Sequence, residues 1–369
     1  MTVDGVALDQ GAVCNASALV PQAGLAGLFA ALGLQLAGLR RVYLLGPTLG
    51  PGPLWMLGRA ERLRPGALSH YPDLRTAAQL AAVSGVAPDQ TLAPEAPGHG
   101  AASALVAAGM AVDRALFLAG LPGVALPTTP MEAPSRGLAG PLRLFLVGAG
   151  SAGTAFLVGL LAARWQLEIG ELTVHLVDHD AVEPRNLNRC MVWDQGHLGS
   201  LKVHAVASTL ATIAVGSGLR LTVGAERFDP EAASAFAPDV VVSAVDNYRA
   251  RAEINAWATR NGKPLIEFGC SPFTARAEVC VPWRSACLRE RLRVDELAQD
   301  EAREASGGCG RRADGAVVGS NMVAAGLGLW GLFALLRGDP PRGALLYDLL
   351  QGTRGVARPK AVCLCWEKG

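Results

Sequence analysis

A strand, a glycine-rich turn and a helix follow one another between residues 142 and 165, and this unit constrains the fold more than any other feature. Residues 142–147 are almost wholly apolar, as expected of a parallel strand that is buried on both faces. They run into Gly148-Ala-Gly150-Ser-Ala-Gly153, after which a helical pattern begins. Glycines in such a turn let the backbone bend sharply and approach phosphates or adenine closely. The unit therefore predicts a nucleotide-binding βαβ fold.

The pattern continues beyond this unit with strands alternating with helices. We expect strands over 172–177, 220–224, 239–245 and 264–268, helices over 202–213 and 250–261, and a strand over 274–281 that leaves the parallel core. This alternation predicts an α/β fold with a doubly wound, mostly parallel Rossmann-like sheet. The predicted domain spans residues 136–369.

Residues 1–135 form a smaller N-terminal α/β domain in this interpretation. A strand is expected at 41–46 and another at 115–119, with helices within 11–39 and 101–112. A Pro- and Gly-rich stretch, 121–141, is the expected linker. We find no catalytic motif in this region, and its role stays open between a degenerate nucleotide-binding fold, a binding module and a dimerisation module.

Composition excludes several classes of protein. The formal net charge is +1 and no Lys/Arg run forms a basic stripe, so nucleic acid is not an expected partner. Eight scattered cysteines in 369 residues do not make a disulfide framework, and the N-terminus has no signal-peptide pattern, so we expect a cytoplasmic protein. The apolar stretch 315–336 is long enough to cross a bilayer, but its glycines favour a buried helix, and no membrane association is expected.

Four charged residues after the glycine turn indicate which nucleotide binds. Asp178 ends the second strand, where a carboxylate accepts hydrogen bonds from ribose hydroxyls. Arg189, Lys202 and Asp246 have no role with a nicotinamide, whereas two cations and a carboxylate suit a triphosphate and its metal. The pattern favours ATP over NAD.

The spacing of these residues resembles the ThiF/MoeB/HesA superfamily, which includes the enzymes that activate ubiquitin and its relatives. That superfamily shows Asp-x-Asp, Asn-Leu-x-Arg, Gly-x-x-Lys and a strand ending in Asp-Asn, in this order. The matching residues here are Asp178, Asp180, Asn186, Asn188, Arg189, Lys202 and Asp246, and the resemblance covers roughly residues 140–340. Ser151 and Cys190 depart from the pattern, since relatives often have glycine and glutamine there.

The resemblance implies a reaction in which a protein's C-terminal carboxylate attacks the α-phosphate of ATP, pyrophosphate leaves and an acyl-adenylate remains. In this interpretation Gly148, Gly150 and Gly153 receive the nucleotide, and Asp178 and Asp180 lie at the ribose end. Arg189 and Lys202 neutralise the transferring phosphate, and Asp246 holds Mg²⁺. Asn186 and Asn188 orient the loop or donate to phosphate.

Two groups of cysteines extend the resemblance. Relatives carry a structural Zn²⁺ on two Cys-x-x-Cys pairs, but here Cys287, Cys363 and Cys365 provide three thiolates and Glu290 stands where a fourth is expected. Thiols without metal are therefore favoured over a zinc site. Cys309, between glycines and followed by two arginines, is the expected nucleophile for a thioester, with Cys287 and Cys190 as less favoured alternatives. Cys270 and Cys280 are expected in the core.

The sequence thus predicts an ATP-dependent adenylyltransferase acting on a ubiquitin-like or sulfur-carrier protein. It leaves open whether a thioester at Cys309 follows, with transfer to a conjugating enzyme. Adenylation of a small peptide or of a tRNA-attached carboxylate, an NAD-dependent Rossmann oxidoreductase and a non-catalytic scaffold are the alternatives. The resemblance also implies a homodimer, because many relatives build their sites across one.

Overall fold

The fold is known from a computed structural model of the chain. It describes 141–165, 170–214, 218–272, 274–306, 318–348, 353–356 and 365–366 in the C-terminal part. In the N-terminal part it describes the pieces 2–3, 6–7, 17–20, 25–36, 39, 41–45, 68–71, 90–91 and residues 104, 106, 108 and 112.

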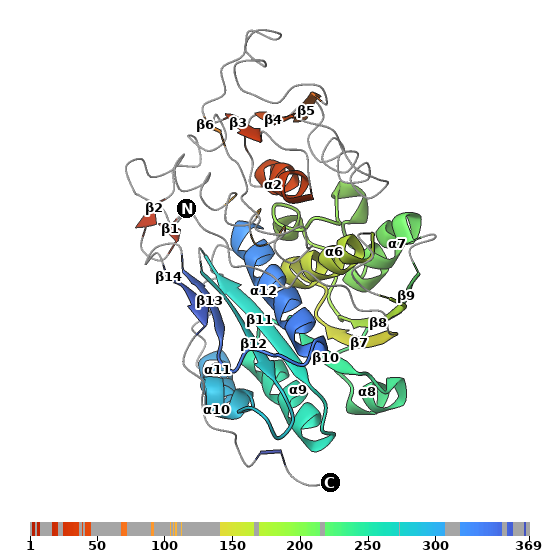
Figure 1. The fold of residues 1–369 in the computed structure, drawn as a ribbon, viewed down its shortest axis with the longest axis vertical. Coiled ribbons are helices and arrows are strands. Elements are labelled where there is room, and N and C mark those ends of the chain that lie inside the picture. The colour runs from red at the N-terminus through yellow and green to blue at the C-terminus, as the bar shows by residue number, and fades with distance from the viewer. Residues whose placement is uncertain are drawn as a thin grey trace.

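An eight-stranded sheet organises the C-terminal part (Figure 1). Its order is β14-β13-β12-β11-β10-β7-β8-β9, where β11, β10, β7, β8 and β9 are parallel and β12, β13 and β14 are antiparallel. The strands are β7 (Leu142–Val147), β8 (Leu172–Val177), β9 (Leu219–Gly224), β10 (Val240–Ser243), β11 (Leu265–Ser271), β12 (Thr274–Cys280), β13 (Leu345–Asp348) and β14 (Thr353–Val356). The apolar strands β7 and β10 are central, which agrees with their burial on both faces.

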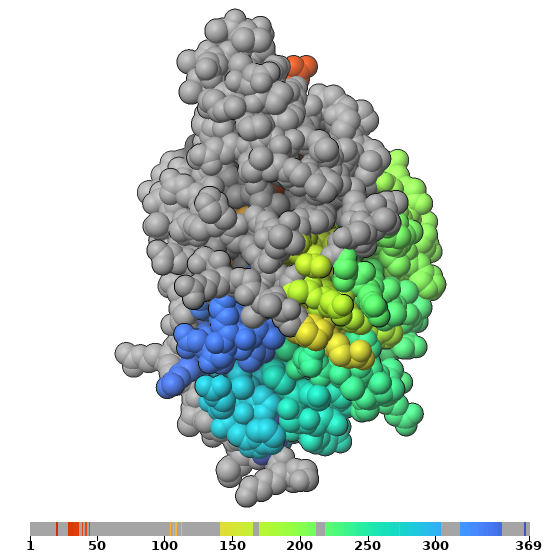
Figure 2. Space-filling model, turned by 45° about the vertical axis from the view of Figure 1, so that its right-hand side comes forward, coloured from red at the N-terminus to blue at the C-terminus, as the bar shows by residue number. Residues whose placement is uncertain are grey.

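Helices cover both faces of this sheet, as a doubly wound fold requires. α6 and α12 pack together on one face, where α12 lies against β11 and β12, while α9 packs against β10, β11 and α11 on the other (Figure 1). The helices are α6 (Ser151–Trp165), α7 (Lys202–Ala214), α8 (Pro230–Phe236), α9 (Tyr248–Arg260), α10 (Leu288–Leu292), α11 (Val294–Ser306) and α12 (Val318–Leu336), with 3-10 helices η1 (Pro184–Asn186) and η2 (Gln195–His197). In the space-filling view these residues, yellow to blue, form a continuous surface (Figure 2).

Two glycines bring α12 unusually close to the sheet. A Cβ on Gly328 would lie 2.4 Å from Cδ1 of Phe268, and one on Gly331 would lie 2.6 Å from Cγ2 of Val279. α12 is the one described helix long and apolar enough to cross a membrane, and 89% of its apolar window is buried inside the protein. The expected buried helix is therefore found, and its glycines serve close packing.

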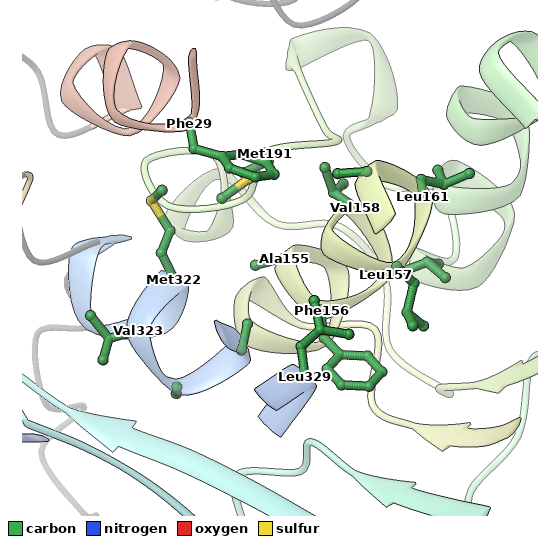
Figure 3. Packing of buried hydrophobic residues seen from close by; sticks show 14 of the residues in the cluster. Phe29, Ala155, Phe156, Leu157, Val158, Leu161, Met191, Met322, Val323 and Leu329 are labelled. Atoms are coloured by element: carbon green, nitrogen blue, oxygen red, sulfur yellow. The ribbon is translucent and has the colours of Figure 1, made fainter. Parts of the chain in front are cut away.

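The N-terminal part contains a second, four-stranded parallel sheet of order β5-β4-β3-β6. Its strands are β3 (Ser17–Val20), β4 (Arg41–Leu45), β5 (Leu68–Tyr71) and β6 (Gln90–Thr91), and β1 (Thr2–Val3) pairs separately with β2 (Val6–Ala7). The apolar helix α2 (Leu25–Leu36) packs against β3, β4 and α12. Figure 3 shows Phe29 of α2 pointing toward Met191 and the Met322 side chain extending from α12 toward α2. These residues belong to one cluster of buried residues that includes strands of both sheets.

The α/β fold with a doubly wound, mostly parallel sheet is confirmed, and so is the departure of β12 from the parallel core. The elements α8, α10, α11, β13 and β14 were not predicted. The strand expected at 115–119 and nearly all of the expected linker lie outside the described residues. The boundary between residues 135 and 136 stays a prediction.

Candidate functional site

The glycine turn joins β7 to α6, and its three glycines meet different surroundings. Gly148 has a left-handed φ of 104°, and a Cβ there would lie 2.5 Å from the carbonyl oxygen of Ala244. A Cβ on Gly153, in the first turn of α6, would lie 2.0 Å from the carbonyl oxygen of Gly148. At Gly150 a Cβ would meet no atom within 4 Å. Gly148 and Gly153 are therefore required by the turn itself, whereas Gly150 borders open space that a ligand can approach.

Asp178 fastens this turn to the end of β8. Its Oδ2 accepts a hydrogen bond from the amide of Ala149 at 2.8 Å, and its Oδ1 accepts one from the amide of Asp180 at 2.8 Å. The carboxylate is half-buried, and each oxygen keeps a second lone pair for a further donor. Asp178 thus shapes the site, and its predicted contact with a ribose stays a prediction.

Lys202, the first residue of α7, is paired with Asp180. Its Nζ lies 2.7 Å from Asp180 Oδ2, and its amide donates to the Asp180 carbonyl oxygen at 2.8 Å. The lysine side chain is 12% exposed, so most of it is covered by the surrounding protein. Burial alone would raise the pKa of Asp180, but the hydrogen bond and charge of Lys202 outweigh it, and the pKa falls below its ordinary value. The Asp180 carboxylate therefore stays ionised near neutral pH.

The loop after β8 places Arg189 against the start of α6. Asn186 Oδ1 accepts from the amide of Glu183 at 3.0 Å, and Asn188 Oδ1 accepts from Arg189 Nη1 at 3.1 Å. The Arg189 carbonyl oxygen accepts from the Ser151 hydroxyl. Both asparagines thus make hydrogen bonds within the loop, and their two expected roles stay predictions.

The Arg189 side chain itself lies half-buried beside charged and polar groups. Burial lowers the pKa of its guanidinium, while the nearby Cys190, Cys270 and Asp246 oppose that shift. Since a guanidinium stays protonated at any physiological pH, Arg189 brings a permanent, partly desolvated positive charge to the site.

Asp246 lies in the turn between β10 and α9. The amide of Ala244 donates to the Val147 carbonyl oxygen at 2.8 Å, so this turn starts beside the glycine turn. Asn247 begins α9 as its N-cap, with Oδ1 accepting from the amide of Ala250 at 2.8 Å, and the Asp246 side chain is exposed. Because β7, β8 and β10 are parallel, their carboxyl ends share one sheet edge, which brings together the predicted charged residues.

A group of metal-binding type also lies at this edge. Oxygen or nitrogen atoms of Asp178, His179 and Asp180 lie within 4.8 Å of one another, the single such group in the described part of the chain. Both Asp178 oxygens already accept amide hydrogen bonds, and Asp180 is paired with Lys202. The exposed carboxylate of Asp246 is thus the better candidate for a hard cation.

The predicted cysteines fall in three places. Cys309 and Cys363 lie outside the described residues. Cys287 is buried and shares a hydrophobic cluster with Cys280 and the half-buried Cys365, so two of the three suggested zinc ligands are neighbours in one cluster. Cys190 is fully buried, with Sγ 3.3 Å from the Thr154 hydroxyl oxygen. Neither the Cys190 thiol nor the Cys287 thiol reaches the surface, so their burial disfavours both as alternative nucleophiles.

Sequence reasoning also misplaced one thiol and missed a charged network. Cys270 was expected in the core, but it is half-buried near Arg189 at the carboxyl end of β11. A position at the end of a parallel strand was the signal that could have found it. The buried Arg251 and Glu267, described below, carried no motif, and only their place in the fold reveals them.

Comparison with known proteins identifies the family. A model of the ThiF family matches residues 139–362, more than half of the chain. The chain belongs to the ThiF family. Within this ThiF chain, 38% of the sequence is 29% identical over 149 residues to human ubiquitin-like modifier-activating enzyme 6. A similar stretch is 31% identical over 150 residues to ubiquitin-activating enzyme E1 2 of Arabidopsis thaliana, and the matches cover 14% and 13% of those relatives.

Solved structures with a related fold include E. coli MccB with ATP, at a TM-score of 0.49 and 17% identity. This match covers 61% of the ThiF chain and 65% of MccB. PaaA has a TM-score of 0.46 at 20% identity, covering 58% of the ThiF chain and 71% of PaaA. At these TM-scores and identities the likeness carries no conclusion about the ThiF chain.

Proposed function

We propose that this ThiF-family chain is an ATP-dependent adenylyltransferase that activates the C-terminal carboxylate of a ubiquitin-like or sulfur-carrier protein. The supporting observation is that an open glycine turn, two cations and an exposed carboxylate all lie at the same edge of the sheet. Gly150 borders open space, and Arg189, Lys202 and Asp246 come from three different loops or helix starts around it. Family membership and the ubiquitin-activating relatives support the same reaction class.

The residues suit the binding of a nucleotide triphosphate. The backbone at Gly150 and the N-terminus of α6 offer amide donors to phosphate oxygens. Lys202 has an ammonium with three donor hydrogens, and its ion pair with Asp180 uses one of them. Arg189 brings a second, permanent positive charge. In this proposal the two cations neutralise the phosphate that is attacked, and Asp178 keeps the glycine turn in shape.

The proposed reaction forms a bond between a carboxylate oxygen and the α-phosphorus of ATP, and it breaks the bond to pyrophosphate. An oxygen of Asp246 would hold Mg²⁺, which when bound neutralises charge on the leaving pyrophosphate. The pre-set positions of Arg189 and Lys202 favour the transition state, because they need no rearrangement as charge develops. A thioester at Cys309, a conjugating enzyme and a homodimer are further parts of this proposal, whereas a Zn²⁺ site on Cys287, Cys363 and Cys365 is the less favoured alternative to free thiols.

ATP–pyrophosphate exchange tests the proposal, using the full chain with candidate ubiquitin-like proteins, short peptides and no partner. Lys202→Ala and Asp246→Ala should each lower exchange by about 100-fold or more, as the removal of a preorganised charged contact does. Lys263→Ala is the matched control, because Lys263 precedes β11 at the opposite sheet edge, and it should exchange like wild type. A wild-type rate of pyrophosphate exchange in Lys202→Ala would refute the assignment of the site. Tight NAD binding without exchange would support an oxidoreductase instead.

A further inference from the structure

A buried network of alternating charges lies under the turn that carries Asp246. Glu267 of β11 has a fully buried side chain, with Oε1 3.0 Å from Nε of Arg251 and Oε2 2.9 Å from Nη1 of Arg276. Arg251 comes from α9 and is 9% exposed, whereas Arg276 comes from β12 and is 25% exposed. A buried carboxylate is unfavourable unless it is paired, and the two guanidinium groups compensate the charge of Glu267. Nη2 of Arg276 also donates a hydrogen bond to Oε1 of Glu267 at 3.2 Å.

Arg251 also reaches out of this network to the turn itself. Its Nη2 donates to the carbonyl oxygen of Val245 at 2.9 Å, one residue before Asp246. Its guanidinium carbon lies 5.0 Å from the centre of the Tyr248 ring, two residues after Asp246. One side chain, anchored by Glu267, therefore touches the chain on both sides of Asp246.

Other contacts also hold the backbone of this turn in place. The amide of Tyr248 donates to Glu301 Oε2 of α11 at 2.8 Å, and Asn247 caps α9. Within the turn the neighbours of Asp246 are half-buried, while the Asp246 side chain is exposed at the sheet edge. The backbone is thus held on both sides, and the carboxylate projects into the site.

We propose that Arg251, held by the buried carboxylate of Glu267, is a positioning residue that fixes Asp246 for adenylation. The catalytic consequence of this inference rests on the proposed function. The claim that Arg251 holds the turn around Asp246 in place does not depend on that function. A positioning error of about 1 Å at such a site is enough to lower a rate by about 100-fold.

The alternative explanation is that Arg251 only stabilises the sheet through its ion pair with Glu267. A comparison with Arg276 distinguishes the two explanations. Arg276 pairs with the same Glu267 carboxylate at a similar distance. Among the contacts of the described residues, it has no hydrogen bond to the turn at 244–247. Arg251→Gln and Arg276→Gln each remove one cation from Glu267, but only the first removes the contact with Val245.

The experiment compares these two variants in the full chain by hydrogen–deuterium exchange without ligand and by ATP–pyrophosphate exchange. In Arg251→Gln, amides of 245–250 should exchange faster by about fivefold or more, because the turn opens locally. The kcat of pyrophosphate exchange should fall by about 10-fold or more, with KM for ATP changed less than about twofold. Arg276→Gln should match wild type within about twofold in both measurements.

Unchanged amide exchange at 245–250 in Arg251→Gln would overturn the proposal, and so would equal effects of the two variants. If the wild type shows no pyrophosphate exchange with any substrate, the proposed function fails, while amide exchange still decides the positioning claim. If Arg251→Gln does not fold, Glu267→Gln takes its place, since it removes the anchoring charge at nearly constant volume. The same loosening of 245–250 is then expected, and its absence refutes the inference.

Discussion

The three glycines of the turn after β7 should separate stability from nucleotide binding. In Gly153→Ala the new methyl group would lie 2.0 Å from the Gly148 carbonyl oxygen, so backbone must move by about 1 Å or more. Such overpacking costs about 1–3 kcal/mol, and the contact here belongs at the upper end. For a domain of this size, about 3 kcal/mol lowers Tm by about 6–12 °C. Gly148→Ala should do the same, because its φ of 104° adds backbone strain.

Gly150→Ala should behave in the opposite way. Its Cβ would meet no protein atom within 4 Å, and its φ lies outside the left-handed region, so stability should change by less than about 1 kcal/mol. A methyl group would, however, stand where a phosphate approaches the backbone, and about 1.4–3 kcal/mol of lost binding raises the Kd for ATP by about 10-fold or more.

Scanning calorimetry and titration calorimetry with a non-hydrolysable ATP analogue measure the two effects on the same samples. The two variants should affect different quantities. Gly150→Ala should have a wild-type Tm and weak nucleotide binding, whereas Gly153→Ala should have a lowered Tm. Wild-type affinity in Gly150→Ala would show that the nucleotide does not lie over this turn. A wild-type Tm in Gly153→Ala would refute the close packing of the turn.

Three further predictions follow from the described contacts. Lys202→Met should raise the pKa of Asp180 from its lowered value to or above the ordinary value of an aspartate, measured by NMR titration of the carboxyl carbon. Since the folded pKa is lowered, the pair contributes stability above about pH 4 and loses it as the pH falls through that pKa; an unmoved pKa contradicts this. Gly328→Ala should destabilise the protein by about 1–3 kcal/mol in urea unfolding, and adding Phe268→Leu should recover part of the loss. Cys190 should resist iodoacetamide until the protein unfolds, and rapid alkylation in the native state would contradict its burial.

Much of the C-terminal fold was predictable because its strands are short apolar runs between clear turns. β7, β8 and β11 were all expected within a few residues of their bounds. The glycine turn after β7 identified β7 as the first strand of the nucleotide-binding unit. The late strands β13 and β14 were missed, because Leu345–Asp348 and Thr353–Val356 are runs of only four residues each. Their order depends on pairing with β12, which no local pattern encodes.

The charged residues of the site could be predicted from the sequence, but the contacts between them could not. Asp178 and Lys202 were found by spacing, but the pairing of Lys202 with Asp180 joins a strand end to a helix start across a long loop. Arg251 and Arg249 illustrate the remaining difficulty. Both lie in the first turn of α9, yet Arg249 is 81% exposed and Arg251 is buried. Two positions on a helix differ by about 200° in direction, and only the packed sheet reveals which one faces inward.

The contact between α2 and α12 has a consequence for how the chain is made. α2 is apolar except for Gln35, and a Cβ on Gly33 would lie 2.9 Å from Sδ of Met322, so these helices pack closely. Roughly 280 residues separate them, which a ribosome adds in about 15–60 s. During that interval the emerging α2 lacks the surface that later covers it. The strands β3 and β4, which α2 also contacts, are made early and can cover part of it in the meantime, but folding of the chain can finish only after α12 has left the ribosome.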